Sequence, residues 1–338
     1  MITIAINGFG RIGRRVFRLA LKHPHIRVVA INDISDSKTL SHLLKYDSIH
    51  GKLDAVVSHD DNNIIVNEEI IPLYNYNHPK LIDWTKVNPD YIIESTGKFK
   101  TRTELQHHLR TGGKRVILSV PSIEDDIKTI VLGVNEDLLD GNETILSNAS
   151  CTTNNAAPMI SIIKENFGIK QAYITTIHSY TTDQSLHDQP HKDLRRARAA
   201  GQSIVPTTTG AAKALTKIFP DLHDVIGGCG IRVPVANGSL TDITINIKGS
   251  TSIKEVNHLF KLAADTTLKG ILEYTEDPIV SIDIVGNSNS CIFDAQMTSV
   301  IGNMVKIVGW YDNETGYSSR ILDLICNLSD KNALLSNI

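Results

Sequence analysis

The residue with the clearest chemical potential is Cys151, which lies in the run Ser147–Asn154 between a predicted strand and a predicted helix. A cysteine at the start of a helix meets unpaired backbone N–H groups and the positive end of the helix dipole, and both stabilise a thiolate. Small and hydroxyl side chains surround Cys151, unlike the apolar stripe around a structural thiol. The pattern therefore predicts a nucleophilic cysteine. The other three cysteines are interpreted as buried, inert thiols: Cys229, Cys291 and Cys326.

A partner for this nucleophile is expected at the end of the predicted strand Tyr173–Ile177, where His178 stands. Ligands tend to bind at the ends of strands in sheets of this kind. A single histidine among thirteen is more often a surface or satisfied core residue, so His178 alone carries little weight. Paired with Cys151, it supplies the thiolate–imidazole couple that nucleophilic catalysis requires.

A second candidate site is a glycine-rich turn that follows the predicted strand Ile2–Asn7 and opens a helix, with the pattern Gly8-x-Gly10-x-x-Gly13. The first glycine permits a tight turn, the second lets backbone approach a pyrophosphate, and the third lets helix and strand pack closely. Asp33 ends the next predicted strand, where its carboxylate can bind a ribose diol and repel a 2′-phosphate. This pattern favours NAD over NADP. The alternative is an ordinary strand–helix turn with Asp33 as a helix cap.

Two further features suit bound anions. The run Thr207–Gly210 opens a predicted helix, and a helix N-terminus is a natural anion site. Arg232 lies in the run Ile231–Pro234, where a charge needs a partner, and an anionic ligand is one. A solvated charged face or interface salt bridges are alternative interpretations for three arginines of the polar stretch 179–202: Arg195, Arg196 and Arg198. So small a basic footprint does not favour nucleic acid.

The composition limits the class of protein. The chain has 338 residues with 34 basic and 37 acidic side chains, so no broad field attracts nucleic acid or an anionic membrane. Four scattered cysteines do not suit a disulfide framework or a zinc cluster, and no metal is expected. The sequence contains no signal-peptide pattern and no apolar run of ~20 residues, so a soluble, cytoplasmic protein is expected.

The elements that must position these residues change character along the chain. In residues 1–150, strand and helix patterns alternate, which predicts an α/β fold with a mostly parallel sheet. Later, long strand runs with helices grouped apart predict an α+β domain with an antiparallel sheet. Expected strands are 2–7, 27–32, 91–94, 115–119, 130–132, 145–146, 172–178, 231–235, 239–247 and 305–311, with a hairpin at 64–66 and 70–73. Expected helices are 14–22, 37–46, 102–109, 153–166, 211–218, 253–263 and 317–328.

Six stretches of the sequence resemble phosphorylating glyceraldehyde-3-phosphate dehydrogenase of the bacterial and plastid branch. They are Asn7–Arg14, Ser147–Asn154, Ile177–Tyr180, Asp193–Ala200, Pro206–Ala214 and Trp310–Gly316. The resemblance runs in one order from residue 1 to about 328. It implies a NAD-binding Rossmann domain over residues 1–150, on which a C-terminal helix of about 314–338 packs. It further implies a catalytic domain over 151–313 with a mainly antiparallel sheet, an inter-subunit loop at 179–202 and a homotetramer.

The resemblance also implies a reaction. Cys151 would attack the aldehyde of D-glyceraldehyde 3-phosphate while His178 accepts a proton, hydride would pass to NAD, and inorganic phosphate would release 1,3-bisphosphoglycerate from the thioester. The implied place is glycolysis or gluconeogenesis. The implied cofactor-binding residues are Gly8, Gly10, Arg11, Ile12, Gly13, Asp33, Asn77, Thr96, Ser119, Pro190, Asn313 and Tyr317. The residues implied to bind substrate or phosphate are Ser150, Thr152, Thr181, Arg196, Thr209, Gly210 and Arg232.

Three positions depart from the family pattern, and two alternative functions stay open. Asn77 stands where an arginine near the adenine is usual, Asn155 replaces a second cysteine, and Thr315 replaces a tryptophan. None of these changes removes a reacting group. Erythrose-4-phosphate dehydrogenase, which releases its acyl group to water, is one alternative, and the run Pro206–Ala214 resembles the glyceraldehyde-phosphate branch instead. A non-catalytic NAD-binding paralogue is the other, and the intact reacting pair weighs against it.

Overall fold

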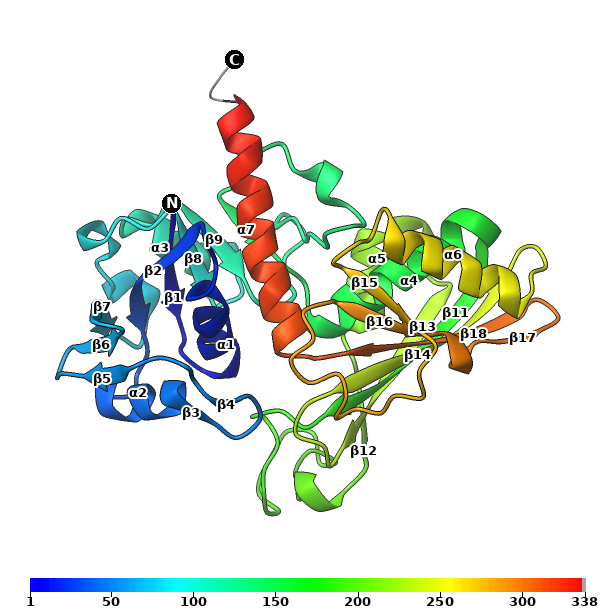
Figure 1. The fold of residues 1–338 in the computed structure, drawn as a ribbon, viewed down its shortest axis with the longest axis horizontal. Coiled ribbons are helices and arrows are strands. Elements are labelled where there is room, and N and C mark those ends of the chain that lie inside the picture. The colour runs from blue at the N-terminus through cyan, green and yellow to red at the C-terminus, as the bar shows by residue number, and fades with distance from the viewer. Residues whose placement is uncertain (336–338) are drawn as a thin grey trace. The chain divides into compact units, whose positions relative to one another are not determined.

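The computed structural model describes residues 1–335 and shows two compact units (Figure 1). Unit 1 comprises Met1–Ile130, Glu136–Ala149 and the chain after Tyr317, and unit 2 comprises Val131–Asn135 and Ser150–Tyr317. The helix was expected over about 314–338, and the last part of that range, residues 336–338, lies outside the described residues. Among residues 1–335, none of the helices combines the length and the apolar character that crossing a membrane requires.

Unit 1 is built on an eight-stranded sheet with the order β10-β9-β8-β1-β2-β7-β6-β5. The strands from β10 to β7 pair in parallel, and β7, β6 and β5 pair antiparallel at one edge. Helices on both faces of a parallel sheet bury its strands, and β8 is buried along its whole length. The bounds are β1 Ile2–Asn7, β2 Ile26–Asn32, β5 Val57–His59, β6 Asn63–Val66, β7 Glu69–Tyr74, β8 Tyr91–Glu94, β9 Arg115–Leu118 and β10 Ile145–Ser147.

The helices of unit 1 begin in different ways. Asp36 caps the second helix and Thr101 caps the third with a full capping box, but the N-cap of the first helix is Gly10, which has no capping side chain. Their bounds are α1 Arg11–Ala20, α2 Ser37–Lys45 and α3 Arg102–Arg110, with a small sheet of β3 Tyr46–Asp47 and β4 Gly51–Lys52. The last helix, α7 Thr315–Leu335, joins unit 1 from Ser318 onward, where Ser329 Oγ lies 3.3 Å from the hydroxyl of Tyr91.

Unit 2 contains a second sheet with the order β12-β13-β11-β14-β18-β16-β15, and β17 pairs with β18. Most neighbours are antiparallel, but β11 pairs with β13 in parallel and so does β15 with β16. Along β14, buried and half-buried residues alternate strictly, as expected for a strand with one covered face. The bounds are β11 Ile169–Ser179, β12 Val205–Thr207, β13 Ile226–Val233, β14 Ser239–Ile247, β15 Leu272–Thr275, β16 Cys291–Asp294, β17 Ser299–Ile301 and β18 Met304–Tyr311.

Three helices cover one face of this sheet, as Figure 1 shows: α4 Cys151–Phe167, α5 Ala211–Ile218 and α6 Ile253–Asp265. The central one, α4, contacts four of the strands and both other helices, and most of its residues are buried. Its N-terminus carries Cys151. Short 3-10 helices occur at Pro79–Leu81, Trp84–Lys86, Glu136–Leu138, Ala200–Gln202, Pro220–Leu222 and Ala295–Met297.

The expected fold class, an α/β domain plus an α+β domain with a mainly antiparallel sheet, is confirmed, and three local expectations are corrected. No strand forms at 130–132, because the chain turns at Gly133, whose φ is +81°, and Asn135 Oδ1 accepts the Val131 N–H at 2.8 Å. The first helix begins at Arg11 and not at residue 14, so Gly13 lies in its first turn. The second sheet is mixed because of its two parallel pairs.

Replacing Gly13 with alanine is expected to destabilise unit 1 by about 1–3 kcal/mol, a typical overpacking cost. A Cβ at this position lies 2.2 Å from the backbone oxygen of Gly8, and this clash outweighs the ~1 kcal/mol by which alanine favours a helix over glycine. Denaturant unfolding measures the difference. Gly10→Ala is the matched control, since a Cβ there meets nothing within 4 Å. Equal losses in both variants would contradict the packing argument.

Candidate active site

Cys151 lies at the first position of α4, directly after a sharp turn from unit 1. Ser150 is the N-cap, and its hydroxyl accepts the N–H of Thr153 at 3.1 Å. The preceding residue, Ala149, has a φ of +55°, a left-handed conformation that is costly for a residue with a Cβ. This turn brings the chain from strand to helix within three residues. The half-buried Cys151 therefore stands at a helix N-terminus, as the sequence predicts.

His178 stands opposite Cys151 from β11. Its Nε2 lies 3.5 Å from the sulfur of Cys151, and the residue is buried, with 7% of its surface exposed. The ring Nδ1 lies 2.7 Å from the backbone oxygen of Ser179. When Nδ1 carries the ring proton it donates to that oxygen, and Nε2 is then able to accept the proton of the thiol. The structure thus brings together the two residues for which the sequence predicts catalytic roles.

Arg232 approaches the same ring from the neighbouring strand. The parallel pairing of β11 with β13 sets Arg232 directly beside His178 in register. Its Nη1 lies 2.5 Å from His178 Nδ1 and donates to the backbone oxygen of Ser179 at 3.0 Å. A hydrogen bond from Arg232 to Nδ1 requires the Nε2–H tautomer, whereas the Nδ1–H tautomer donates to Ser179 and leaves Nε2 free to accept the thiol proton. A guanidinium carries a permanent positive charge, so it opposes protonation of the imidazole.

Burial and this charge decide the protonation of the reacting pair. Burial, and next the charge of Arg232, lower the pKa of His178 to about 3, so the ring is neutral at pH 7. Burial raises the pKa of Cys151, while the charge of Arg232 and the backbone N–H of Thr152 act in the opposite direction. The helix end thus contributes as expected, but burial outweighs it. The resting pair is a thiol beside a neutral imidazole.

Asp183 is a member of this group that the sequence did not reveal. Its carboxylate accepts hydrogen bonds from the hydroxyl of Thr181 and from Arg196 Nη1, the second at 2.6 Å. Burial raises the pKa of Asp183, but the Thr181 hydrogen bond and the charges of Arg232 and Arg196 outweigh it and lower the pKa. Arg196 also donates from Nε to Thr207 at 2.9 Å. The structure thereby joins three of the predicted anion-binding residues, Thr181, Arg196 and Arg232, around one carboxylate.

Other predicted anion-binding residues lie at two helix N-termini of unit 2. Thr152 is buried in the first turn of α4, and its hydroxyl lies 2.9 Å from that of Tyr311. Tyr311, which the sequence did not reveal, also lies 2.9 Å from the hydroxyl of Thr176 and packs edge-on against His178. Gly210 precedes α5 without a capping side chain, and Thr209 Oγ1 accepts the N–H of Ala211 at 3.2 Å.

Asn313 is held at the end of β18 by two buried hydroxyls. Ser179 and Ser239 donate to its Oδ1 at 2.9 and 3.0 Å, which leaves the side-chain NH2 group to donate elsewhere. Asp312, not Asn313, accepts the N–H groups of Glu314 and Thr315 and so begins α7. The remaining predicted residues of unit 2 are Tyr317, which is buried, and Pro190, which is exposed in the segment after β11.

The glycine turn of unit 1 has the form of a dinucleotide cradle. Gly8 has a φ of +94°, and a Cβ there meets the backbone of Thr96 at 2.6 Å. Asp33 Oδ2 accepts the N–H of Phe9 at 2.7 Å, which joins the acidic residue to the turn. Since α1 lacks both a capping side chain and an acidic residue in its first turn, its N-terminal N–H groups suit a pyrophosphate. These residues fit NAD.

The remaining predicted cofactor residues of unit 1 lie on the same sheet or beside it. Arg11 forms a bidentate ion pair with Asp47, with Nη1–Oδ2 at 2.7 Å and Nη2–Oδ1 at 3.2 Å. The pKa of Asp47 is lowered to about 2. Burial raises that pKa, but the N–H groups of His50 and Ile49 and the charge of Arg11 outweigh it. Ser119 donates its N–H to the backbone oxygen of Glu94 at 3.0 Å. Ile12 lies in the first turn of α1, and Asn77 is exposed after β7.

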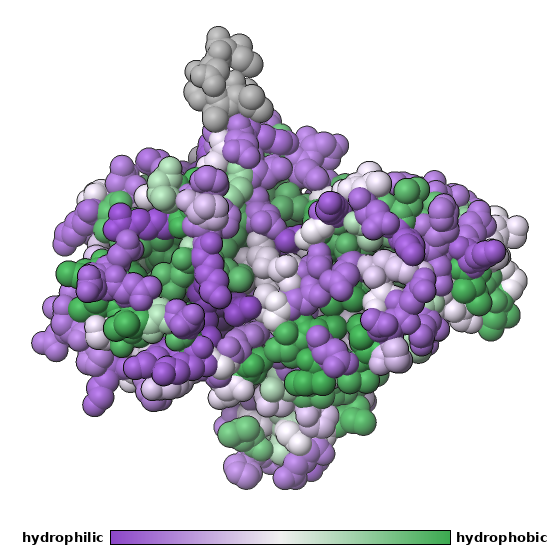
Figure 2. Space-filling model, in the orientation of Figure 1, coloured by the Kyte–Doolittle hydropathy of each residue, from purple (hydrophilic) through white to green (hydrophobic). Residues whose placement is uncertain are grey.

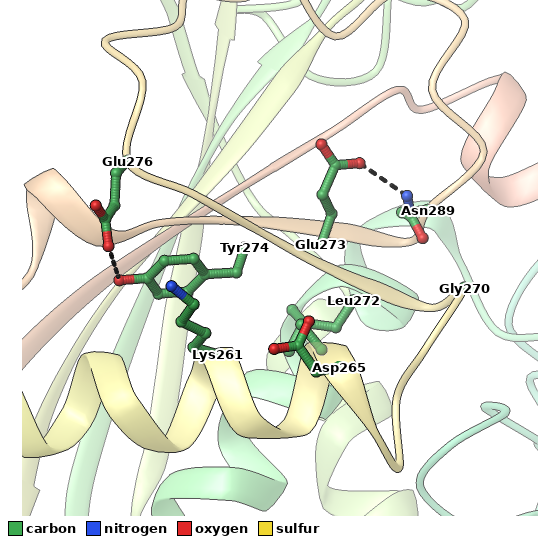
Figure 3. A pocket seen from close by; sticks show the side chains of 9 residues that line it. Lys261, Asp265, Gly270, Leu272, Glu273, Tyr274, Glu276 and Asn289 are labelled. Carbon is green, nitrogen blue, oxygen red and sulfur yellow. Dashed lines mark hydrogen bonds between the residues drawn. The ribbon is translucent and has the colours of Figure 1, made fainter.

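A groove of about 480 Å³ between α6 and β15 is a separate feature of unit 2 (Figure 3). Its polar side chains engage one another, because Lys261 lies over the ring of Tyr274 and the Tyr274 hydroxyl donates to Glu276 at 2.9 Å. None of the predicted site residues lines it. The groove is therefore not part of the candidate active site.

A dinucleotide-binding α/β unit, together with a cysteine–histidine pair beside a half-buried arginine, defines a dehydrogenase that works through a covalent cysteine intermediate. Comparison with known proteins identifies the family. The model described as "Glyceraldehyde 3-phosphate dehydrogenase, NAD binding domain" matches residues 2–102, and the corresponding C-terminal domain matches residues 150–313. The chain belongs to the glyceraldehyde-3-phosphate dehydrogenase family.

Curated relatives match almost the whole chain. Glyceraldehyde-3-phosphate dehydrogenase of Geobacillus stearothermophilus is 50% identical over 332 residues, which is 98% of this chain and 99% of the relative. Glyceraldehyde-3-phosphate dehydrogenase 2 of Streptomyces avermitilis is 51% identical over 326 residues, 96% of this chain and 97% of the relative. The sequence-based identification is confirmed, and with it NAD as cofactor and the class of NAD-dependent oxidoreductase. The roles of individual residues stay predictions.

Replacing Arg232 with leucine is expected to slow the alkylation of Cys151 by iodoacetamide at pH 7. Loss of the positive charge raises the pKa of the thiol further, and each pKa unit lowers the thiolate fraction about tenfold. The pH–rate midpoint therefore moves to higher pH. Iodoacetamide is neutral, so binding of an anionic substrate does not enter the measurement. Arg198→Leu is the control, because Arg198 is exposed and pairs with Asp188. An unchanged or faster alkylation of the Arg232 variant would contradict the electrostatic account.

Proposed function

We propose that this protein catalyses the phosphorylating oxidation of D-glyceraldehyde 3-phosphate to 1,3-bisphosphoglycerate in glycolysis or gluconeogenesis. The observation that carries the proposal is the approach of Cys151 Sγ to His178 Nε2 at 3.5 Å, with Arg232 beside the ring. The names of the relatives, at about half of the residues identical over nearly the full length, support the same reaction.

The first steps follow from the protonation of the pair. As the sulfur of Cys151 attacks the aldehyde carbon, its proton moves to His178 Nε2, which accepts it when the neutral ring carries its own proton on Nδ1 and donates it to the backbone oxygen of Ser179. The product is a thiohemiacetal on Cys151. NAD, when bound, supplies the oxidant that takes the hydride and leaves a thioester. The backbone N–H at the start of α4 stabilises negative charge on the substrate oxygen.

The last step needs an anion to attack the thioester. Inorganic phosphate adds to the carbonyl carbon, the carbon–sulfur bond breaks, and the acyl phosphate leaves while Cys151 recovers a proton. We assign the substrate phosphate to Thr181 and Arg232 and the attacking phosphate to a second group. That group consists of Ser150, Thr152, Thr209 and Gly210, with Arg196 in the same region. Support comes from the positive charges of Arg232 and Arg196 and from the two helix N-termini.

For the cofactor, we assign the pyrophosphate to the turn Gly8–Gly13 with Arg11 and Ile12, and the adenosine ribose to Asp33. Asn77 and Thr96 follow on the adenosine side, and Ser119, Asn313 and Tyr317 on the nicotinamide side, with Pro190 favouring NAD over NADP. The free donor group of Asn313 supports its assignment to the carboxamide. Residues 1–150 then form the cofactor domain and residues 151–313 the catalytic domain.

We further assign a homotetramer and a cytoplasmic location. Exposed apolar side chains support the first: Leu186, Leu194, Ile204, Val280 and Ile282 are each more than half exposed. Figure 2 shows hydrophobic residues gathered on the part of unit 2 where Figure 1 draws β14 and β12. All four cysteines are free thiols, which suits a reducing compartment.

Two kinetic measurements test the reaction. His178→Asn is expected to lower kcat/KM by about 10²- to 10⁴-fold, the usual contribution of a positioned proton acceptor. In the unsubstituted enzyme, leaving out phosphate is expected to stop NADH formation after about one turnover, because the thioester then persists on Cys151. A rate indifferent to phosphate, with a four-carbon sugar phosphate preferred over the three-carbon aldehyde, would contradict the proposal.

The assembly is tested by light scattering coupled to size exclusion. The unsubstituted protein is expected to have the mass of four chains, and Leu194→Glu is expected to give smaller species. Leu194 is 81% exposed, and a charge placed in an interface is costly to desolvate. Val56→Glu on unit 1, where the side chain is 73% exposed, is the control. A monomeric mass for the unsubstituted protein would rule out the tetramer.

A further inference from the structure

Unit 1 contains a buried carboxylate that the proposed reaction does not use. Glu94 ends β8 and is completely buried, as are His108 on α3 and Trp84. Removing a carboxylate from water costs several kcal/mol unless hydrogen bonds replace its hydration. No lysine or arginine is hydrogen-bonded to Glu94 among the contacts of the described residues. An ion pair with a lysine or arginine therefore does not account for this buried carboxyl group, and its hydrogen bonds must explain why it is there.

Hydrogen-bond donors surround both oxygens of Glu94. Oε1 accepts the backbone N–H of Thr96 at 2.9 Å and also its hydroxyl. Oε2 accepts the side-chain NH2 of Asn7 and the Nε2–H of His108, the latter at 3.0 Å. The N–H of Thr96, the NH2 of Asn7 and the Nε2–H of His108 all point at the carboxyl oxygens, so both oxygens act as acceptors. The group is an acceptor only, which is the property of the ionised form.

The orientation of His108 is fixed from its other side. Trp84 Nε1, which is a donor only, lies 3.0 Å from His108 Nδ1. Nδ1 must therefore be the unprotonated nitrogen, and Nε2 must carry the proton that points to Glu94. His108 itself lies in the last turn of α3, whose start is fixed by the capping box of Thr101 and Glu104. A packed indole thus holds a neutral imidazole, and the imidazole holds the carboxylate.

The same carboxylate joins the loops of the dinucleotide cradle. Asn7 directly precedes Gly8, and its Oδ1 accepts the side chain of Asn32, which precedes Asp33, at 2.7 Å. The Thr96 backbone that Glu94 holds is the one packed against Gly8, where a Cβ would lie 2.6 Å from its nitrogen. Three neighbouring parallel strands, β2, β1 and β8, therefore have their carboxyl ends tied to one charge.

We propose that Glu94 is a positioning residue for NAD binding. It fixes the distance between the Gly8 turn and the Thr96 backbone, and through Asn7 and Asn32 it fixes the turn relative to Asp33. The inference rests on the assignment of the cofactor to unit 1, and it does not depend on which aldehyde is oxidised. Glu94 does not have to touch the dinucleotide for this role.

The test is Glu94→Gln, measured by titration calorimetry with NAD in the absence of aldehyde. The amide keeps the shape but turns an NH2 group toward one pair of donors, so a mismatch replaces two hydrogen bonds. The Kd for NAD is expected to rise about 10- to 100-fold, as for other residues that orient a binding group. The KM for NAD rises with it, while kcat at saturating NAD stays within about threefold of the unsubstituted enzyme.

Glu104→Gln is the matched control, because Glu104 also accepts backbone N–H groups, at Lys100 and Thr101, but does not contact the cradle. It is expected to lower the thermal stability and to leave the Kd for NAD unchanged. The proposal is overturned if Glu94→Gln binds NAD with an unchanged Kd, if its defect is confined to kcat, or if Glu104→Gln weakens NAD binding equally. The last result would mean that any loss of stability in unit 1 weakens the cofactor site.

A second variant decides the matter if Glu94→Gln does not fold. Trp84→Phe keeps an aromatic ring in the core but removes the N–H that selects the His108 tautomer. His108 is then able to turn a lone pair toward Glu94, so a rise of about threefold or more in the Kd for NAD is expected. An unchanged Kd in folded Trp84→Phe overturns the proposal in that case.

Discussion

Arg232 Nη1 lies 2.5 Å from His178 Nδ1 and 3.0 Å from the backbone oxygen of Ser179, so a permanent positive charge stands beside a buried ring that carries none. The charge and the burial act in the same direction on the imidazole and in opposite directions on the thiol of Cys151. A fully protonated imidazole would give up its capacity to accept a proton. The arginine therefore helps to keep the ring in its neutral form, with Nε2 3.5 Å from the sulfur of the nucleophile.

This arrangement depends on a feature of topology. Within a mainly antiparallel sheet, β11 and β13 are parallel, and their register sets Arg232 beside His178 at strand ends that point the same way. In an antiparallel pair, the carboxyl end of one strand lies beside the amino end of the other. Two residues near the carboxyl ends of such strands would then lie at opposite edges of the sheet and not beside each other. The parallel pair of the mixed sheet thus gathers functional residues at adjacent carboxyl ends in unit 2. The parallel sheet of unit 1 does the same, because β1, β2 and β8 bring Asn7, Asn32 and Glu94 together.

The sequence was sufficient for the fold class, for most elements and for the reacting pair, because these leave a periodic or a motif signal. The helix at 211–218 and the strand at 239–247 were predicted with their observed bounds. The missing strand at 130–132 shows the limit, since a short apolar run is compatible with a strand or a turn, and Gly133 with Asn135 selects the turn. Asp183, Tyr311 and Glu94 were missed for a different reason. Tyr311 contacts Thr152 from a distant part of the chain. Asp183 and Glu94 have nearer partners, Arg196 and His108, but neither a motif nor a periodic pattern records those contacts.

The same distinction explains why the departures from the family pattern leave the network intact. Thr315 stands in place of an aromatic residue, yet Asn313 is held by Ser179 and Ser239 from β11 and β14, and Thr315 donates its N–H to Asp312. Asn155 fills the place of a second thiol, is completely buried, and donates to the backbone oxygen of Trp310 at 3.2 Å. The ring of His178 is instead held by Ser179 and Arg232. A side chain at position 155 or 315 has to fit the available volume and satisfy its own hydrogen bonds. A change at Arg232 or Glu94 instead leaves a buried group, such as His178 or His108, without its partner. We therefore expect the tolerance of a position in this protein to follow from how many buried groups depend on it, more than from its distance to Cys151.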